Sequence, residues 1–155
     1  MLEIERKFLV NDLSALSKAS SQQLLVQAYL CTDPARTVRI RIAKNEAFIT
    51  IKGASQTDGI SRFEWEKSIE ISEAEQLMLL AELPPIRKQR YVIPWGELKV
   101  ELDVFEGANA GLVIAEIELP SADFPLKIPS WLGKEVSDDP RYYNSYLIEH
   151  PFVHW

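Results

Sequence analysis

The chain has 155 residues, of which 46% are hydrophobic and 26% charged, and its formal net charge is −6. This size and composition are typical of one globular domain, so residues 1–155 are expected to form a single domain, and the acidic balance argues against general nucleic-acid binding. No apolar run could span a bilayer and Glu3 and Glu5 exclude a secretory h-region, which predicts a cytoplasmic location.

The first half of the chain alternates polar and apolar residues, as half-buried strands do. A strand is predicted at 2–9, with Glu3, Glu5 and Lys7 on one face, and a helix candidate follows from Asp12 to about Ser20. Further strands are predicted at about 26–31, 36–43, 46–52 and 61–71. The links between them are short, apart from a longer loop from Gly53 to Gly59.

The second half opens on a helix. Ser72 to Glu75 has the sequence of a capping box, Leu77, Leu80 and Ala81 follow on one face, and Pro84-Pro85 ends the helix. Strands are predicted at 87–94, 97–105 and 112–119, and Asp139-Pro140 begins a last helix through about Leu147. Eight strands with short links predict an α+β fold, namely an eight-stranded antiparallel closed β-barrel with a few flanking helices.

The strands divide their side chains into an apolar face and a charged face. The apolar face, which includes Ile40, Trp65 and Val100, needs covering by the helices or by a partner subunit in a homodimer, so the charged face would line the lumen. Buried charges of both signs are costly unless they are paired, bound to metal or neutralised by a charged guest. An apolar lumen with salt bridges on an outer solvated sheet is the alternative.

The two signs of charge suggest two guests. Hard oxygen donors suit Mg²⁺ or Mn²⁺, and the acidic group consists of Glu3, Glu5, Glu101, Asp103, Glu116 and Glu118. Cations suit phosphate oxygens, and the cationic group consists of Arg39, Arg41, Lys52, Lys88 and Arg90. Cys31 is the only cysteine, which excludes a thiolate metal cluster. A divalent ion bridging carboxylates and a phosphate chain predicts a phosphoryl-transfer site.

Seven motifs in register carry a resemblance over nearly the whole chain. They are E-x-E-x-K at 3–7, T-V-R-I-R at 37–41, T-I-K-G at 50–53, S-R-F-E-W-E at 61–66, K-x-R-Y at 88–91, E-L-D-V-F at 101–105 and A-E-I-E-L at 115–119. The chain resembles the CYTH, or triphosphate tunnel metalloenzyme, superfamily. It is most similar to the short bacterial members, which share W-L-G-x-E-V at 131–136 and R-Y-Y-N at 141–144. It departs from them at Ala54 and Arg87.

The resemblance implies a tunnel in which cations hold a triphosphate and carboxylates hold divalent metal. By motif position, the metal ligands would be Glu3, Glu5, Glu116 and Glu118, supported by Glu101 and Asp103. Phosphates would be bound by Arg39, Arg41, Lys52, Lys88 and Arg90. Lys7 would sit at the substrate, and Glu64 and Glu66 would complete the acidic set. The candidate catalytic residues are therefore Lys7, Lys52, Lys88, Glu64 and Glu66.

The predicted function is metal-dependent hydrolysis of inorganic tripolyphosphate to pyrophosphate and phosphate by attack of a polarised water. Adenylate cyclase, nucleoside triphosphatase or thiamine triphosphatase chemistry is the alternative on the same fold. A non-catalytic polyphosphate-binding module is the alternative of another class, and the many carboxylates argue against it. No set of residues suited to reading adenine is evident, which favours the inorganic substrate. Tyr29 could face phosphate or pack between strands, and Lys134 and Arg141 are weaker candidates for the tunnel mouth.

Overall fold

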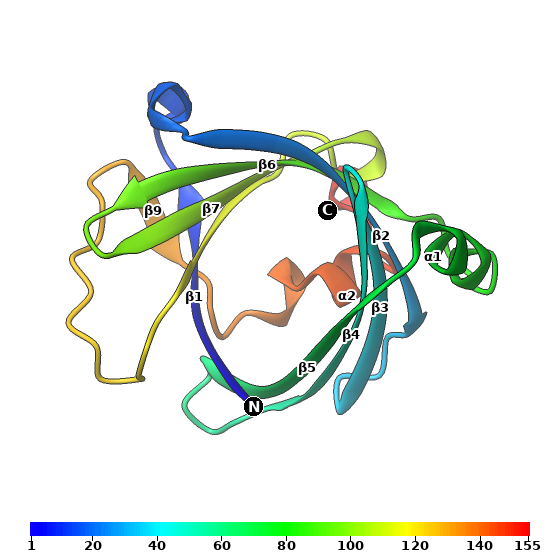
Figure 1. Ribbon diagram of the computed structural model, residues 1–155. Coiled ribbons are helices and arrows are strands. Elements are labelled where there is room, and N and C mark those ends of the chain that lie inside the picture. Colours follow the sequence, from blue (N-terminus) through cyan, green and yellow to red (C-terminus); the bar gives the residue numbers. More distant parts are fainter.

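The computed structural model describes residues 1–155, and eight antiparallel strands close into the predicted barrel. The strands are β1 (Leu2–Val10), β2 (Ser21–Cys31), β3 (Arg36–Ala43), β4 (Glu46–Ser55), β5 (Ser61–Ile69), β6 (Ile86–Trp95), β7 (Leu98–Phe105) and β8 (Val113–Glu118). Neighbours follow the order β5-β4-β3-β2-β6-β7-β8-β1, and pairing of β1 with β5 closes the ring (Figure 1).

β1 pairs with two different strands along one of its edges. Leu2 to Ile4 pair with the start of β5, whereas Phe8 and Val10 pair with a ninth strand, β9 (Leu132–Glu135). The opposite edge of β1, from Glu5 to Leu9, pairs with β8. β9 was not predicted as a strand, although it lies within the W-L-G-x-E-V motif, and it continues the barrel wall beyond the end of the pairing with β5.

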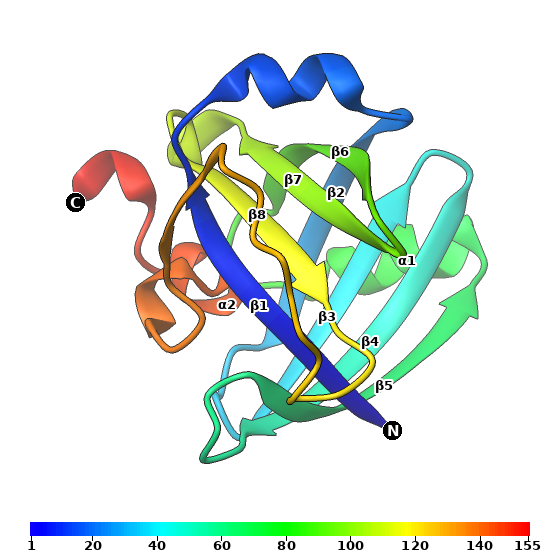
Figure 2. The same cartoon turned by 90° about the vertical axis from the view of Figure 1, so that its left-hand side faces the viewer.

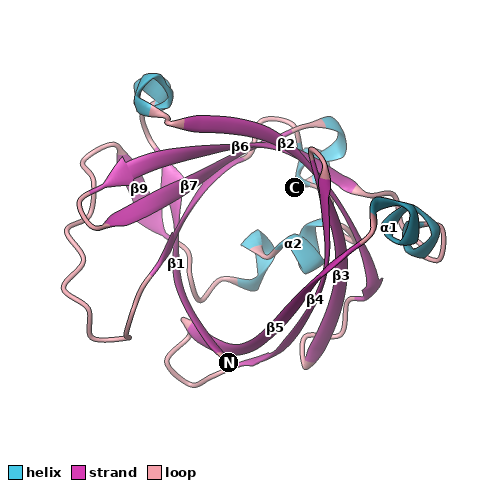
Figure 3. Cartoon of the chain, in the orientation of Figure 1, coloured by secondary structure: helices cyan, strands magenta, loops and turns pink.

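The helices are fewer than the strands, and the longest of them, α1, has eight residues (Figure 3). The predicted segment after Asp12 is a 3-10 helix, Leu13–Lys18, and the Asp12 carboxylate accepts a hydrogen bond from the Ser14 N–H. α1 (Ile71–Met78) begins earlier than the sequence suggested, because the Glu73 carboxylate accepts a hydrogen bond from the Glu70 N–H at 3.0 Å. Glu70 is therefore the N-cap, and the prediction of Ser72 in that position was wrong.

Both predicted helix ends also need correction. α1 ends at Met78, so Leu80 leaves the helical face and is 69% exposed, while Ala74 is the fully buried residue. The predicted last helix is interrupted, because Tyr143 has an extended backbone with φ −77° and ψ 137°. Pro140–Tyr142 forms a 3-10 turn capped by Asp139, and α2 (Asn144–Leu147) follows it.

The apolar face of the strands packs outside the barrel, as predicted. One cluster joins β1 and β6–β8 to the 3-10 helix and β9, and it includes Phe8, Ala15, Ile93, Leu102 and Leu132. A smaller cluster buries Ala74 of α1 against Ile40 and Ala47, so α1 covers the outside of β3 and β4 (Figure 1). The alternative of an apolar lumen with charges outside is therefore excluded.

The C-terminal part of the chain lies across one end of the barrel (Figure 2). At that end Leu147 and Ile148 pack against Ile86, Phe105 and Ile114. These three residues are two positions from Lys88, Asp103 and Glu116 on β6, β7 and β8, so they share the inward-facing side of each strand. The inward face is thus charged along most of the lumen and apolar where α2 closes it. No helix of the structure has both the length and the apolar character needed to cross a membrane.

Candidate active site

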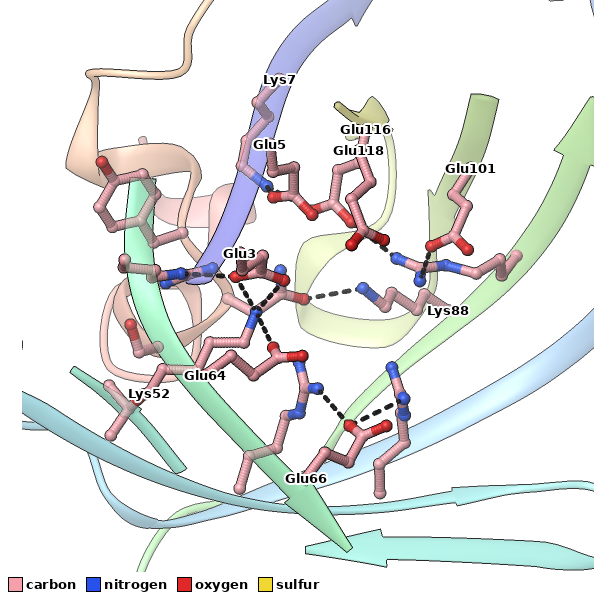
Figure 4. A pocket seen from close by; sticks show the side chains of 18 of the residues that line it. Glu3, Glu5, Lys7, Lys52, Glu64, Glu66, Lys88, Glu101, Glu116 and Glu118 are labelled. Carbon is pink, nitrogen blue, oxygen red and sulfur yellow. Dashed lines mark hydrogen bonds and ion pairs between the residues drawn. The ribbon is translucent and has the colours of Figure 1, made fainter. Parts of the chain in front are cut away.

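The lumen contains a cavity of about 270 Å³ whose walls are almost entirely polar. Every predicted site residue lines it except Asp103, which is on the same inward face but fully buried beneath Lys88 and Arg90. Figure 4 shows the labelled glutamates and lysines projecting toward one another from several strands. The alternation of side chains along each strand, read from the sequence, therefore brings the predicted residues together.

Opposite charges meet directly across neighbouring strands on the β1–β5–β4 side. Glu3 is paired in register with Arg62, and Lys52 with Glu64. The Lys52 Nζ lies 2.8 Å from Glu3 Oε1 and 2.8 Å from Glu64 Oε2, and the Arg62 Nε donates to Glu3 Oε2 at 2.9 Å. Burial alone would raise the pKa of Glu3, but attraction to Lys52 and Arg62 outweighs burial and lowers the pKa to about 2. Glu3 is therefore ionised throughout the neutral range.

The pKa of Glu3 predicts a pH-dependent contribution to stability. Because its pKa in the folded state is below the usual value, the charged carboxylate stabilises the fold above pH 4.5, and this contribution is lost as the pH falls toward 2. The contribution at neutral pH is about 3 kcal/mol. In metal-free buffer, the difference in free energy of unfolding between wild type and Glu3→Gln should shrink over this interval. The exposed Glu97→Gln serves as control, and a difference independent of pH would contradict the assignment.

Lys88 and Arg90 are both held by Asp103. The Asp103 carboxylate accepts from Lys88 Nζ at 2.5 Å and from Arg90 Nε and NH2 at 2.7 Å each, and Arg90 NH2 also donates to Glu116 Oε2 at 2.8 Å. Burial, together with repulsion from Arg90, lowers the pKa of Lys88 to about 8 despite the attraction of Asp103. These contacts favour a role for Asp103 in orienting Lys88 and Arg90. Its support of a metal ion stays a prediction.

Arg39 and Arg41 form a cationic pair with too little negative charge beside it. Both guanidinium groups approach the same Glu66 Oε2, at 3.6 Å from Arg39 and 3.3 Å from Arg41. The Nε of each arginine is buried and has no hydrogen-bond partner. Burial lowers the pKa of Arg41, and repulsion from Arg39 lowers it further. An anion with several oxygens would satisfy both groups.

The junction of β1 and β8 shows the reverse imbalance. Glu5 lies directly opposite Glu118, and Lys7 directly opposite Glu116. Burial raises the pKa of Glu5, and repulsion from Glu116 adds to it; burial also raises the pKa of Glu118, with added repulsion from Glu3 and Glu5. Glu5 and Glu118 therefore have too little positive charge beside them, and their oxygens are the kind of ligand that a hard divalent cation prefers.

These carboxylates do not surround a common point in the structure. No three acidic side chains form a ready-made ligand set, because Glu3 is engaged by Lys52 and Glu116 by Lys7 and Arg90. The donor atoms therefore fit a divalent ion, but existing ion pairs must open for several carboxylates to bind it. The metal-binding roles remain predictions.

Sequence reasoning missed part of the lining. Thr37, Tyr143, Asn144 and Ser145 also face the cavity, and the last three come from the segment that closes the barrel. Arg62 lies on the charged face with Glu64 and Glu66, as the strand period predicts, but no role was assigned to it. Tyr143 and Asn144 lie in the R-Y-Y-N motif, so a signal was present in the sequence. Tyr29 lines the cavity and also packs in the apolar cluster near α2, and its contact with phosphate stays a prediction. Lys134 and Arg141 do not line the cavity.

Comparison with known proteins matches the CYTH domain model to residues 1–143. The chain belongs to the CYTH domain family. An inorganic triphosphatase of Acetivibrio thermocellus is 42% identical to this CYTH chain over 151 residues, which cover 97% of this chain and 95% of the relative. An inorganic triphosphatase of Nitrosomonas europaea is 37% identical over 158 residues, covering 95% of this chain and 97% of the relative.

Solved structures share the CYTH barrel. The crystal structure of the inorganic triphosphatase NE1496 superimposes with a TM-score of 0.64 and 33% identity, covering 94% of this chain and 97% of that chain. A putative adenylyl cyclase from Hippeastrum with a dominant triphosphatase activity has a TM-score of 0.62 at 18% identity, covering 77% of this chain and 80% of that chain. This second likeness shows the fold alone. The family resemblance predicted from the seven motifs is confirmed.

Proposed function

We propose that this CYTH protein is a phosphoanhydride hydrolase that cleaves inorganic tripolyphosphate to pyrophosphate and phosphate. The observation that carries this proposal is the division of the lumen into a side with surplus positive charge, at Arg39 and Arg41, and a side with surplus negative charge, at Glu5 and Glu118. A triphosphate and a divalent cation balance these two surpluses together. The two curated relatives, both inorganic triphosphatases, support the same substrate.

Each group of residues has a distinct role in this proposal. Mg²⁺ or Mn²⁺, when bound, neutralises phosphate charge and polarises the reacting oxygens. The residues that would hold it are Glu3, Glu5, Glu116 and Glu118, with Glu101 beside them. Phosphate oxygens are bound and oriented by Arg39, Arg41, Lys52, Lys88 and Arg90. Glu64 and Glu66 engage Lys52 and the arginine pair, and an acidic residue of this set orients the attacking water.

Lys7 lies at the boundary between the acidic and phosphate-binding sides. Its Nζ contacts Glu116 and lies 3.3 Å from Glu5 Oε1, so it touches two of the proposed metal ligands. Burial would lower the pKa of Lys7, but attraction to Glu116 and Glu5 raises it above the usual value. Lys7 is therefore a permanent cation, placed to contact a phosphate oxygen beside the metal.

A hydrolysis panel tests the proposed function. Tripolyphosphate, ATP, thiamine triphosphate and long polyphosphate are each supplied with Mg²⁺, with Mn²⁺ or with chelator. We expect tripolyphosphate to have a higher kcat/KM than ATP, because an organic substituent adds bulk without compensating contacts. We also expect chelator to abolish turnover, and no cyclic AMP to form.

Each contrary result points to one of the alternatives. Comparable efficiency on ATP, or any cyclic AMP, would favour the organic-triphosphate chemistries. Binding of tripolyphosphate without hydrolysis of any substrate would favour the polyphosphate-binding module, and turnover after exhaustive chelation would exclude a metal-dependent reaction. Four expectations stay predictions: a single domain over residues 1–155, a cytoplasmic location, a homodimer and the absence of nucleic-acid binding.

A further inference from the structure

Asn144 joins the closing segment to the cationic side of the lumen. It is the first residue of α2, and its side chain lines the cavity. The Asn144 Oδ1 accepts two hydrogen bonds, from Lys88 Nζ at 3.1 Å and from Gln27 Nε2 at 2.8 Å. Lys88 and Gln27 are both buried. These hydrogen bonds therefore attach α2 to the inside of the barrel, as the apolar packing of Leu147 against Phe105 and Ile114 also does.

The chemistry of Lys88 determines which way the amide of Asn144 points. An ammonium group offers only donors, so the Asn144 atom that faces Lys88 must be the oxygen. The Gln27 atom that faces the same oxygen must then be its nitrogen, which leaves the Gln27 Oε1 buried without a partner. The unpaired Gln27 Oε1 costs free energy, so the orientation of the Asn144 amide toward Lys88 is maintained despite this cost.

The Nδ2 of Asn144 is consequently free for another partner. It donates to no protein atom and is not among the buried atoms that lack a partner, so it is exposed, and Asn144 is one of the residues that line the cavity. Its two N–H groups lie next to Lys88 Nζ, a cation that also lines the cavity. A phosphate oxygen that reaches Lys88 is therefore within reach of a neutral donor from the closing segment.

We propose that Asn144 is a substrate-binding residue whose Nδ2 donates a hydrogen bond to the terminal phosphoryl group at the closed end of the lumen. Its Oδ1 at the same time orients Lys88 toward that group. This inference rests on the proposed function for the class of substrate. The group recognised is a terminal phosphate, because Leu147 and Ile148 pack with Ile86, Phe105 and Ile114 next to this part of the lumen and offer an ester substituent no polar partner there.

Asn144→Asp separates the two roles of the amide. The aspartate has nearly the same shape and keeps an oxygen for Lys88 and Gln27, but it replaces the N–H donors with an anionic oxygen that repels phosphate. We expect KM for tripolyphosphate to rise at least about tenfold, with kcat changed much less and the melting temperature kept. Asn45→Asp, in the exposed turn between β3 and β4, adds the same charge away from the site and should leave KM unchanged.

A binding measurement keeps this test independent of the proposed activity. Calorimetric titration with tripolyphosphate in the absence of divalent cation reports affinity whether or not this compound is the preferred substrate, and it should show the same loss for Asn144→Asp. If Asn144→Asp does not fold, Asn144→Ala is used and should still weaken binding several-fold. A KM and Kd within twofold of wild type, or a loss confined to kcat, would overturn the substrate-binding role.

Discussion

Glu5→Gln is expected to lower turnover of tripolyphosphate by about 100-fold or more, since a bound metal supplies several kcal/mol of transition-state stabilisation. The fold should meanwhile be as stable as wild type or more stable. Burial and repulsion from Glu116 raise the pKa of Glu5, so its charge is a cost to the folded state. Turnover with saturating Mg²⁺ and thermal unfolding in metal-free buffer measure the two effects separately.

Glu116→Gln is the matched comparison and should lose both activity and stability. Burial alone would raise the pKa of Glu116, but attraction to Lys7 and Arg90 lowers it well below the usual value. Neutralising Glu116 leaves Lys7, a residue that is 5% exposed, with only the more distant Glu5 as a partner. Unfolding of Glu5→Gln at a temperature well below wild type would show that Glu5 is structural.

Arg39→Ala and Arg41→Ala are each expected to lower kcat/KM for tripolyphosphate by about 100-fold, as loss of a preorganised donor to a charged group typically does. Each variant removes one of two guanidinium groups that share Glu66, so the remaining arginine still balances that carboxylate and the melting temperature should change little. Affinity for tripolyphosphate without metal should fall in parallel, because we propose that the arginines contact the substrate directly.

Lys134→Ala is the control for the arginine variants. Lys134 is exposed on β9 and does not line the cavity, so solvent screens its charge and its loss should change kcat/KM by less than about twofold. Equal losses at Arg39, Arg41 and Lys134 would mean that long-range attraction of the polyanion, and not contact in the lumen, explains the effect of the arginines.

The composition of the lumen could be predicted because the strand period is two. Glu3, Glu5 and Lys7 lie on one face of β1. Side chains alternate in the same way along each of the remaining strands, so their charged residues are assigned to the lumen side as well. The charge balance within the lumen could not be predicted. Nearby cations outweigh the burial of Glu3 but do not outweigh the burial of Glu5. This difference depends on the register between strands that are distant in sequence.

β9 and the closed end escaped prediction for different reasons. β9 has four residues, includes Gly133, and forms only through pairing with β1, so it has little local signal of its own. The closed end did leave a signal. The inward faces of β6, β7 and β8 change from charged to apolar at Ile86, Phe105 and Ile114, and an apolar inner surface at one end of a polar lumen requires a cover.

The divided pairing of β1 bears on how the protein folds. Glu5 pairs with Glu118 and Phe8 with Glu135, so β1 depends on partners more than about 100 residues away in the chain. Pairing strands at such separation has a high entropic cost of loop closure, which slows the folding of a domain. During synthesis β2 to β7 can pair with their neighbours while β1 still lacks β8 and β9. The junction of β1 and β8, where Glu5 and Lys7 face Glu118 and Glu116, can therefore form only after most of the barrel wall has been synthesised.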